Sequence, residues 1–329
     1  MEQQLDTAQW YRTFAGHTRG HSQDYERLCS AIADDQTILT LLAELPQPRR
    51  QPNLLLASVR YHQGPVHDVP RFRDWLVEHW PQVRTTMLQR RTQTNEVGRC
   101  ATLLPVLAAL PQPLALIEVG ASAGLCLYPD RYSYRYHGDL HTELGPTHSP
   151  VVLDCTVAGR PPLPDSPPRV AWRAGIDLNP LDVTSPDDIT WLECLVWPGQ
   201  PERLRTLNAA VSVARAQPPT LWSGDLNTGI QDLLRRVPTG ATPVVMHTAV
   251  LAYLDRGARE RFATTMREFD GYWISNESPS VFPEINAHAP AAPTEAETFL
   301  MAVNGTPVAF TAPHGQRMDW FADHHPAAL

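Results

Sequence analysis

The chain has 329 residues, of which 43% are hydrophobic and 19% charged, and its formal net charge at pH 7 is −8. This length suits one large domain or two smaller ones. The acidic balance excludes a protein that binds bulk nucleic acid or an anionic membrane through a global basic surface. No apolar run approaches the ~20 residues of a membrane-spanning helix, and the N-terminus lacks a signal-peptide core. We therefore expect a cytoplasmic protein.

The chain shows no strong sign of a disulfide framework or a metal centre. Its five cysteines are scattered and never spaced C-x-x-C, which is typical of reduced, buried thiols. Two histidine pairs, His62 with His67 and His137 with His141, have usable spacings. Neither pair comes with a third ligand in a recognisable pattern, so we expect no metal.

Residues 1–112 are predicted to form a helical N-terminal domain that covers the cleft of the second domain. Apolar residues recur at three- and four-residue intervals over residues 25–45. Residues 82–110 are predicted as one long helix that Pro105 kinks or interrupts. Within it, residues 90–99 place polar groups on nearly every face, which indicates either a solvated helix or one that lines a site.

Residues 113–329 are predicted to form an α/β domain, because short apolar runs alternate with helical patterns. Residues 114–119 are its first buried strand, and residues 131–168 are an insertion. Asn304-Gly305 marks the turn of a C-terminal hairpin. The expected fold is a Rossmann-like, mostly parallel sheet of the class I methyltransferase type with an antiparallel C-terminal hairpin.

The first strand runs into the loop Gly120-Ala121-Ser122-Ala123-Gly124. In the preferred interpretation this loop binds S-adenosylmethionine (SAM): Gly120 and Gly124 allow a tight turn and close approach of the ligand. Glu118, at the end of the strand, would bind the ligand's ammonium. A helix beginning after the loop would offer free N–H groups to its carboxylate.

The same residues fit the G-x-S-x-G nucleophile elbow of a serine hydrolase, with Ser122 as the nucleophile. An elbow of that fold needs several strands before it, and none is predicted upstream of Leu114. A tight turn without any ligand is a third possibility. A dehydrogenase is disfavoured because the G-x-G-x-x-G spacing is missing.

Further acidic residues come after the next predicted strands. Asp177, in "GIDLNP", is preferred over Asp139 as the residue that holds the ribose hydroxyls. Asp225 and Leu226, in "SGDL", are predicted cofactor contacts, with Asp225 bonded to the adenine. The alternatives are a loop aspartate bonded to its own backbone for Asp177 or Asp139, and a helix N-cap for Asp225.

His247 ends the predicted fourth strand, and Asn276 and Glu277 end the fifth. All three are expected at the carboxyl edge of the sheet, where ligands bind in open α/β folds. We predict His247 and Glu277 as catalytic residues that hold or deprotonate the acceptor, and Asn276 as a substrate contact. A satisfied buried histidine and the start of a turn are the structural alternatives.

Several stretches, in this order, resemble the bacterial domain-of-unknown-function family 2332 over nearly the whole chain: "RRTQTNEVGR", "EVGASAGL", "RYSYRY", "GIDLNPLDV", "LVWPGQPERL", "SGDL", "VVMHTAVLAYL", "WISNE" and "PHG". The resemblance implies that residues 90–99 belong with the glycine loop. It supports a substrate-binding role for Gln93, Asn95, Glu96 and Arg99, and a functional role for His247. One departure is Cys126, where the family usually has Asn.

Together these features predict a SAM-dependent methyltransferase, or a methyltransferase-like protein, that acts on a small-molecule, peptide or protein acceptor. Methyl transfer needs mainly in-line positioning, so an obvious catalytic triad is not required. A serine hydrolase and a non-catalytic binding protein are the alternatives. The sequence determines neither the acceptor nor the oligomeric state.

Overall fold

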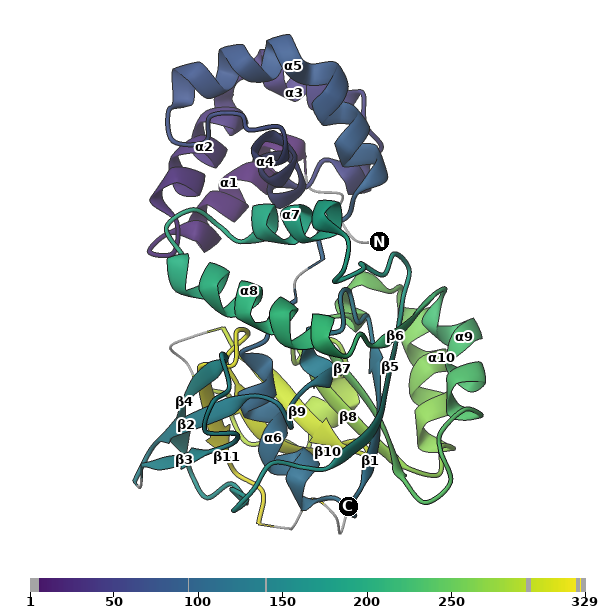
Figure 1. The fold of residues 1–329 in the computed structure, drawn as a ribbon. Coiled ribbons are helices and arrows are strands. Elements are labelled where there is room, and N and C mark those ends of the chain that lie inside the picture. Colours follow the sequence, from purple (N-terminus) through teal and green to yellow (C-terminus); the bar gives the residue numbers. More distant parts are fainter. Residues whose placement is uncertain (1–5, 94, 140, 294–296, 324–325, 327–329) are drawn as a thin grey trace. The chain divides into compact units, whose positions relative to one another are not determined.

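The computed structural model describes residues 6–93, 95–139, 141–293, 297–323 and 326 (Figure 1). The chain forms two compact units, Met1–Thr94 with Thr184–Arg205, and Asn95–Val183 with Thr206–Leu329. This division differs from the expected boundary after residue 112. Within the described residues, no helix is long and apolar enough to cross a membrane.

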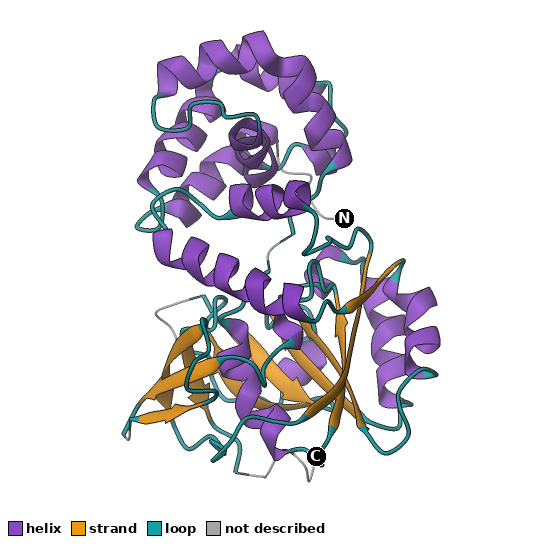
Figure 2. Cartoon of the chain, in the orientation of Figure 1, coloured by secondary structure: helices purple, strands orange, loops and turns teal. Residues whose placement is uncertain are grey.

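The first unit consists of helices and their connections (Figure 2). Four of its described helices begin at side-chain caps: Ser22, Asp35, Asp68 and Ser185 each accept a hydrogen bond from a backbone N–H in the first turn. The elements are α1 (Thr7–Thr18), α2 (Gln23–Asp34), α3 (Gln36–Ala43), the 3₁₀ turn η1 (Gln47–Arg49), α4 (Pro52–Tyr61), α5 (Val69–Gln89), α7 (Pro186–Leu195) and the start of α8 (Pro201–Ala216).

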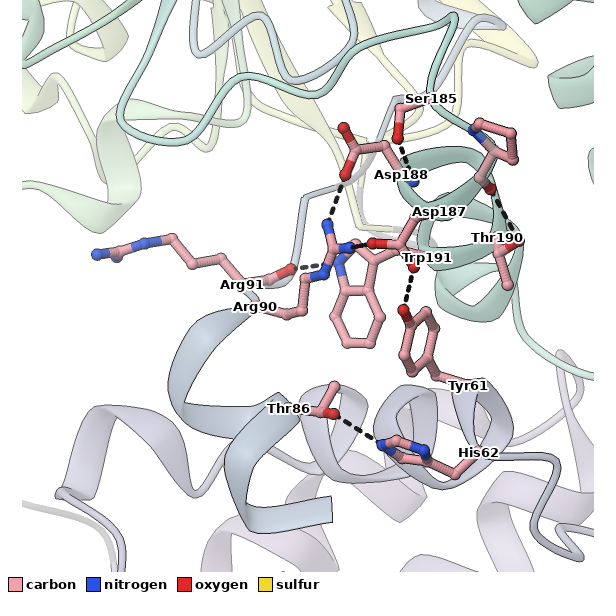
Figure 3. A network of polar contacts seen from close by, with 11 residues as sticks. Tyr61, His62, Thr86, Arg90, Arg91, Ser185, Asp187, Asp188, Thr190 and Trp191 are labelled. Carbon is pink, nitrogen blue, oxygen red and sulfur yellow. Dashed lines mark hydrogen bonds and ion pairs between the residues drawn. The ribbon is translucent and has the colours of Figure 1, made fainter. Parts of the chain in front are cut away.

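A polar cluster around Arg90 joins α7 to the preceding helices of this unit (Figure 3). The Arg90 guanidinium forms ion pairs with Asp187 and with Asp188, the latter at 2.6 Å. It also lies 5.9 Å from the ring centroids of both Tyr61 and Trp191. Contacts between residues about a hundred positions apart leave no periodic signal, which is why the sequence did not predict this part of the unit.

The single long helix expected over residues 82–110 is wrong. Helix α5 ends at Gln89, and α6 (Arg99–Ala109) begins ten residues later in the second unit. The described residues between them are not helical. Polar side chains of this stretch bond to other segments of the fold, as Asn95 does to the glycine loop, and these tertiary bonds outweigh helix propensity.

The second unit contains one mixed sheet, whose eleven strands in the described chain have the order β3-β2-β4-β11-β10-β9-β8-β7-β1-β5-β6. The expectation of a mostly parallel sheet with an antiparallel C-terminal hairpin is confirmed. The strands are β1 (Leu114–Val119), β2 (Ser133–His137), β3 (Thr142–Leu144), β4 (Val152–Ala158), β5 (Val170–Asp177), β6 (Thr220–Ser223), β7 (Thr242–Thr248), β8 (Tyr272–Glu277), β9 (Phe299–Val303), β10 (Thr306–Thr311) and β11 (Arg317–Trp320).

Strand β1 is fully buried and pairs in parallel with β5 on one side and β7 on the other. Alternate residues therefore face opposite sides of the sheet. Ile117 and Val119 pack with α9 (Leu226–Leu234) and α10 (Arg256–Arg267) in one apolar core (Figure 1). Glu118 faces the other side, where α6 lies.

The segment between β1 and β5 carries β2, β3 and β4, which extend the sheet beyond β11. The hairpin β9–β10 turns at Asn304 and Gly305, both with positive φ, as the Asn-Gly pair predicts. The short helix α11 (Pro283–Asn286) and the turn η3 (Leu251–Tyr253) complete the unit.

Candidate functional site

The loop after β1 is the sharp turn that its glycines predict. Gly120, Ser122 and Gly124 have φ values of 69°, 50° and 71°, a region that only glycine occupies at no steric cost. A Cβ atom on Gly120 would lie 2.3 Å from a methyl carbon of Val250. The turn therefore depends on glycine at position 120 for both conformation and space.

The helix expected after this loop is absent. Gly124 leads into the buried three-residue turn η2 (Leu125–Leu127), and the chain continues to β2. A turn of this length has no appreciable macrodipole. The expectation that a helix N-terminus would bind the ligand carboxylate is therefore wrong.

Most backbone N–H groups of the loop donate to acceptors within the protein, so they do not form an open anion cradle. These acceptors come from β5 and from residue 95 as well as from the loop itself. The bonds run from Gly120 (2.8 Å) and Ala121 (3.3 Å) to the Ile176 carbonyl, from Ser122 to Asp177 Oδ2 (2.9 Å), from Gly124 to the Ala121 carbonyl (2.6 Å) and from Leu125 to Asn95 Oδ1 (2.9 Å).

Asp177 ends β5 beside the loop, whereas Asp139 is exposed beyond β2 in the inserted part of the sheet. The placement favours Asp177 of the two candidates. Its Oδ1 also accepts from the Asn179 N–H at 2.8 Å, which is the contact of an Asx turn. Asp177 thus braces the loop, and its contact with a ribose stays a prediction.

Glu118 is a buried carboxyl group, with an exposed fraction of 6%. Burial raises its pKa well above the ordinary value, the nearby Cys126 adds to the shift, and the Arg99 cation opposes it. Its Oε2 atom and the Ser122 hydroxyl are both buried without a hydrogen-bond partner in the described chain. Unpaired buried polar atoms are costly, so these two oxygens mark a position suited to a ligand.

Residues 95–99 join the glycine loop, the end of β7 and the loop after β10 at the carboxyl edge of the sheet. Asn95 spans the glycine loop, since its Nδ2 donates to the Ala121 carbonyl at 3.3 Å while its Oδ1 accepts from Leu125. Glu96 Oε2 bonds His314 Nδ1 at 2.9 Å. Arg99 donates to the carbonyls of Thr248, at the end of β7, and of Pro313, in the loop after β10. The segment is therefore not a solvated helix.

The resemblance-based grouping of this segment with the glycine loop agrees with the contacts of Asn95. The side chains of Glu96 and Arg99 bond instead to the end of β7 and to the loop after β10, and their substrate contacts stay predictions. Gln93 is also buried, but it belongs to the helical unit, and its place at the site stays a prediction. Cys126, the departure from the family pattern, donates its thiol to the Glu96 carbonyl at 3.4 Å. A thiol at this position thus helps to hold residues 95–99.

His247 and Glu277 form a buried pair whose bonds are all internal. Nδ1 of His247 lies 2.8 Å from Glu277 Oε1, and its Nε2 accepts from the Trp273 indole N–H at 2.9 Å. Glu277 also accepts from the N–H groups of Val250 and Leu251. Neither ring nitrogen is free, so the geometry opposes the expected role of His247 as a general base. The pair positions the loop after β7.

Asn276 lies on the opposite face of β8 and is completely buried. Its Oδ1 accepts from the Thr311 hydroxyl at 2.8 Å, while its Nδ2 has no partner in the described chain. Thr248, Thr311 and His314 were not predicted as site residues. For Thr248 the only sequence signal was the stretch "VVMHTAVLAYL", and for His314 it was "PHG".

Three predicted cofactor contacts have structural roles. Asp225 is the exposed N-cap of α9 and accepts from the Asn227 N–H at 2.9 Å, as its alternative predicted. Leu226 packs in the apolar core with α10. Ala121 is buried with its methyl group against Gly175, where an added Cβ would lie 2.5 Å away. Their contacts with a ligand stay predictions.

The described residues contain no group of three or more His, Cys, Asp or Glu side chains that could hold a metal ion. Each histidine of the two pairs noted in the sequence has a nearby partner. His62 bonds Thr86, His67 bonds Asp24, His137 bonds Asp154 and His141 bonds Glu143.

Comparison with known proteins gives one match. No curated protein and no solved structure matches the chain. Residues 8–320 match the sequence model of a family described as "Uncharacterized protein conserved in bacteria (DUF2332)". Because this match covers nearly the whole chain, from the first helix to the last strand of the sheet, the protein belongs to the DUF2332 family.

Proposed function

We propose that the second unit binds SAM beside the loop after β1, and that the protein is a SAM-dependent methyltransferase or a methyltransferase-like protein. The observation that carries this proposal is the buried Glu118 carboxyl with its unpartnered Oε2 atom. An ammonium group would supply the partner that Oε2 lacks, and it would favour the charged form of the carboxyl that burial disfavours.

The topology supports the position of the site. From β1 the chain returns to β5 on one side and later to β7 on the other, with all three strands parallel. Ligands of open α/β sheets bind outside the carboxyl ends of the strands at such a switch point. Strands β6-β5-β1-β7-β8 form the parallel part of the sheet, and the antiparallel hairpin follows it.

The residues fit the polar groups of SAM to different degrees. Glu118 and the Ser122 hydroxyl suit its ammonium and a neighbouring polar group, and the proposal includes a contact of Asp177 with a ribose hydroxyl. The loop does not suit its carboxylate, because most of its N–H groups are already bonded. SAM would supply the methyl group, and Arg99 and Asn276 would orient the acceptor.

A non-catalytic binding protein with the same sheet is the second candidate. It is favoured by the internally bonded loop and by the absence of a helix after it. A serine hydrolase is less well supported. The Ser122 hydroxyl has no hydrogen-bond partner in the described chain, and both nitrogens of His247 are occupied. We expect no labelling of Ser122 by an active-site phosphonate.

Calorimetric titration with SAM and with S-adenosylhomocysteine tests the proposal. We expect binding to wild type and a loss of about tenfold or more in Glu118→Gln, since a hydrogen bond to a charged group is worth ~1.5–3 kcal/mol. Glu143→Gln, on the exposed edge strand β3, is the matched control and should bind as wild type does. Absence of binding by folded wild type, or equal binding by Glu118→Gln, would refute the assigned site.

A further inference from the structure

Arg99 is a buried cation that forms no ion pair with any residue that the structure describes. Its exposed fraction is 6%, and it donates to neutral oxygens: the Pro313 carbonyl at 2.8 Å, and the carbonyl and hydroxyl of Thr248 at 3.0 and 3.1 Å. Its guanidinium also lies 5.7 Å from the Phe299 ring centroid. No carboxylate of the described residues lies within ion-pair distance, and no bond from its Nη2 is found there.

A second unsatisfied donor lies beside it. Thr248 of β7 is in direct register with Asn276 of β8. Paired residues on neighbouring strands face the same side of the sheet, so Arg99 and Asn276 both border Thr248. The Nδ2 of Asn276 is buried and unpartnered. The Thr248 hydroxyl accepts from Arg99, which leaves its hydrogen free to donate.

This cluster has donors and positive charge but no anion to match them. An uncompensated buried cation and an unpaired buried amide each cost free energy, and one anionic group with two oxygens would satisfy both. Glu118 is the carboxyl that Arg99 affects electrostatically, but burial favours its neutral form. A neutral Glu118 therefore does not balance the positive charge of Arg99.

We propose that Arg99 and Asn276, with Thr248, form a carboxylate-binding subsite at the carboxyl ends of β7 and β8. A carboxylate matches the single cation in charge and matches the planar edge of a guanidinium in shape. A phosphate carries roughly two negative charges, more than the single positive charge of Arg99 can balance. Only the source of the carboxylate, the methyl acceptor or SAM itself, rests on the proposed function.

Sodium acetate is the probe, compared with sodium chloride at equal ionic strength so that screening is the same. Acetate should raise the Tm of wild type by about 2 °C or more, because a ligand that binds only the folded state stabilises it. Asn276→Asp retains the Thr311 contact but replaces the donor with a carboxylate oxygen. It should abolish the acetate effect, and its own Tm should equal or exceed that of wild type because it pairs with Arg99.

Asn208→Asp makes the same charge change on α8 and should keep the acetate effect. The subsite is refuted if acetate does not raise the Tm of wild type, or raises it equally in Asn276→Asp. Because these titrations contain no SAM, their failure is distinct from a failure to bind SAM. Adding SAM identifies the source: competition with acetate assigns the carboxylate to SAM, and simultaneous binding assigns it to the acceptor.

Discussion

The carboxylate of Asp177 accepts the backbone N–H of Ser122 at 2.9 Å and thereby ties the end of β5 to the loop after β1. Its other oxygen accepts from Asn179. In Asp177→Asn one oxygen becomes an NH₂ group that faces an N–H donor. We expect the free energy of unfolding to fall by about 1–3 kcal/mol, as for other buried donors left unpaired. Urea denaturation monitored by tryptophan fluorescence measures this change.

Asp225→Asn is the control for this substitution. Asp225 caps α9 from an exposed position, and Asn caps helices about as well as Asp. The control should therefore lose little stability. If both variants lost the same amount, the loss would come from the change of charge and not from the bond to Ser122.

Gly120→Ala should destabilise the protein by more than backbone strain alone. The new Cβ meets Val250 at 2.3 Å, and the φ of 69° adds the penalty of a left-handed residue, about 1–2 kcal/mol. Gly240→Ala is the control, because its φ is 83° and no atom lies within 4 Å of the added Cβ. In a double-mutant cycle, Val250→Ala should remove most of the extra loss that Gly120→Ala shows over Gly240→Ala. Additive losses would argue against this packing.

Burial of Glu118 predicts a characteristic pH dependence of stability. Its pKa is raised in the folded state, so the folded protein holds a proton that the unfolded chain releases above its ordinary pKa of 4.5. This contribution is complete below that value and is lost as the pH rises towards the folded pKa. Glu118→Gln lacks this titrating group. The free energy of unfolding of the variant, relative to that of wild type, should therefore rise as the pH increases. Parallel stability curves would contradict a raised pKa.

Local patterns predicted the elements that they specify directly. The apolar run Leu114–Val119 is a buried strand, Asn304-Gly305 forms the hairpin turn, and the strand context correctly placed Asp177 beside the loop. The helix expected after Gly124 was wrong because a glycine loop does not determine the type of the next element in the chain. Here the buried turn η2 leads to an insertion instead.

Long-range contacts account for the features of the site that the sequence could not predict. Glu96 and His314 are 218 positions apart, and Arg99 reaches Thr248 across 149. Such pairs leave no periodic trace in one sequence. The polar stretch of residues 90–99 did signal a special role, but its pattern fits a solvated helix equally well. Only the fold shows that Asn95 and Arg99 join separate loops.

The His247 ring should carry its proton on Nδ1. That nitrogen faces the Glu277 carboxylate, and Nε2 accepts from the Trp273 indole. Long-range ¹H–¹⁵N spectra of histidine-labelled protein identify the tautomer. In Trp273→Phe the Nε2 atom loses its donor, and the protein should lose about 1–3 kcal/mol of stability for an unpaired buried acceptor. A proton on Nε2 in wild type would reopen the assignment of this residue.

Arg90 should determine how firmly residues 184–205 stay attached to the helical unit. Its guanidinium pairs with Asp187 and Asp188 and lies near the rings of Tyr61 and Trp191 (Figure 3). Arg90→Gln removes the charge that holds both carboxylates, so we expect a loss of about 1–3 kcal/mol. Arg90→Lys should recover only part of it, since an ammonium cannot reproduce the planar fork.

Limited proteolysis measures this attachment directly. The connection at residues 196–200, between α7 and α8, should be cut faster in Arg90→Gln because local opening exposes it more often. Arg71→Gln makes the same chemical change at an exposed position of α5 and should leave the cleavage rate unchanged. Equal cleavage of wild type and Arg90→Gln would mean that apolar packing of Trp191, and not the ion pairs, holds α7 in place.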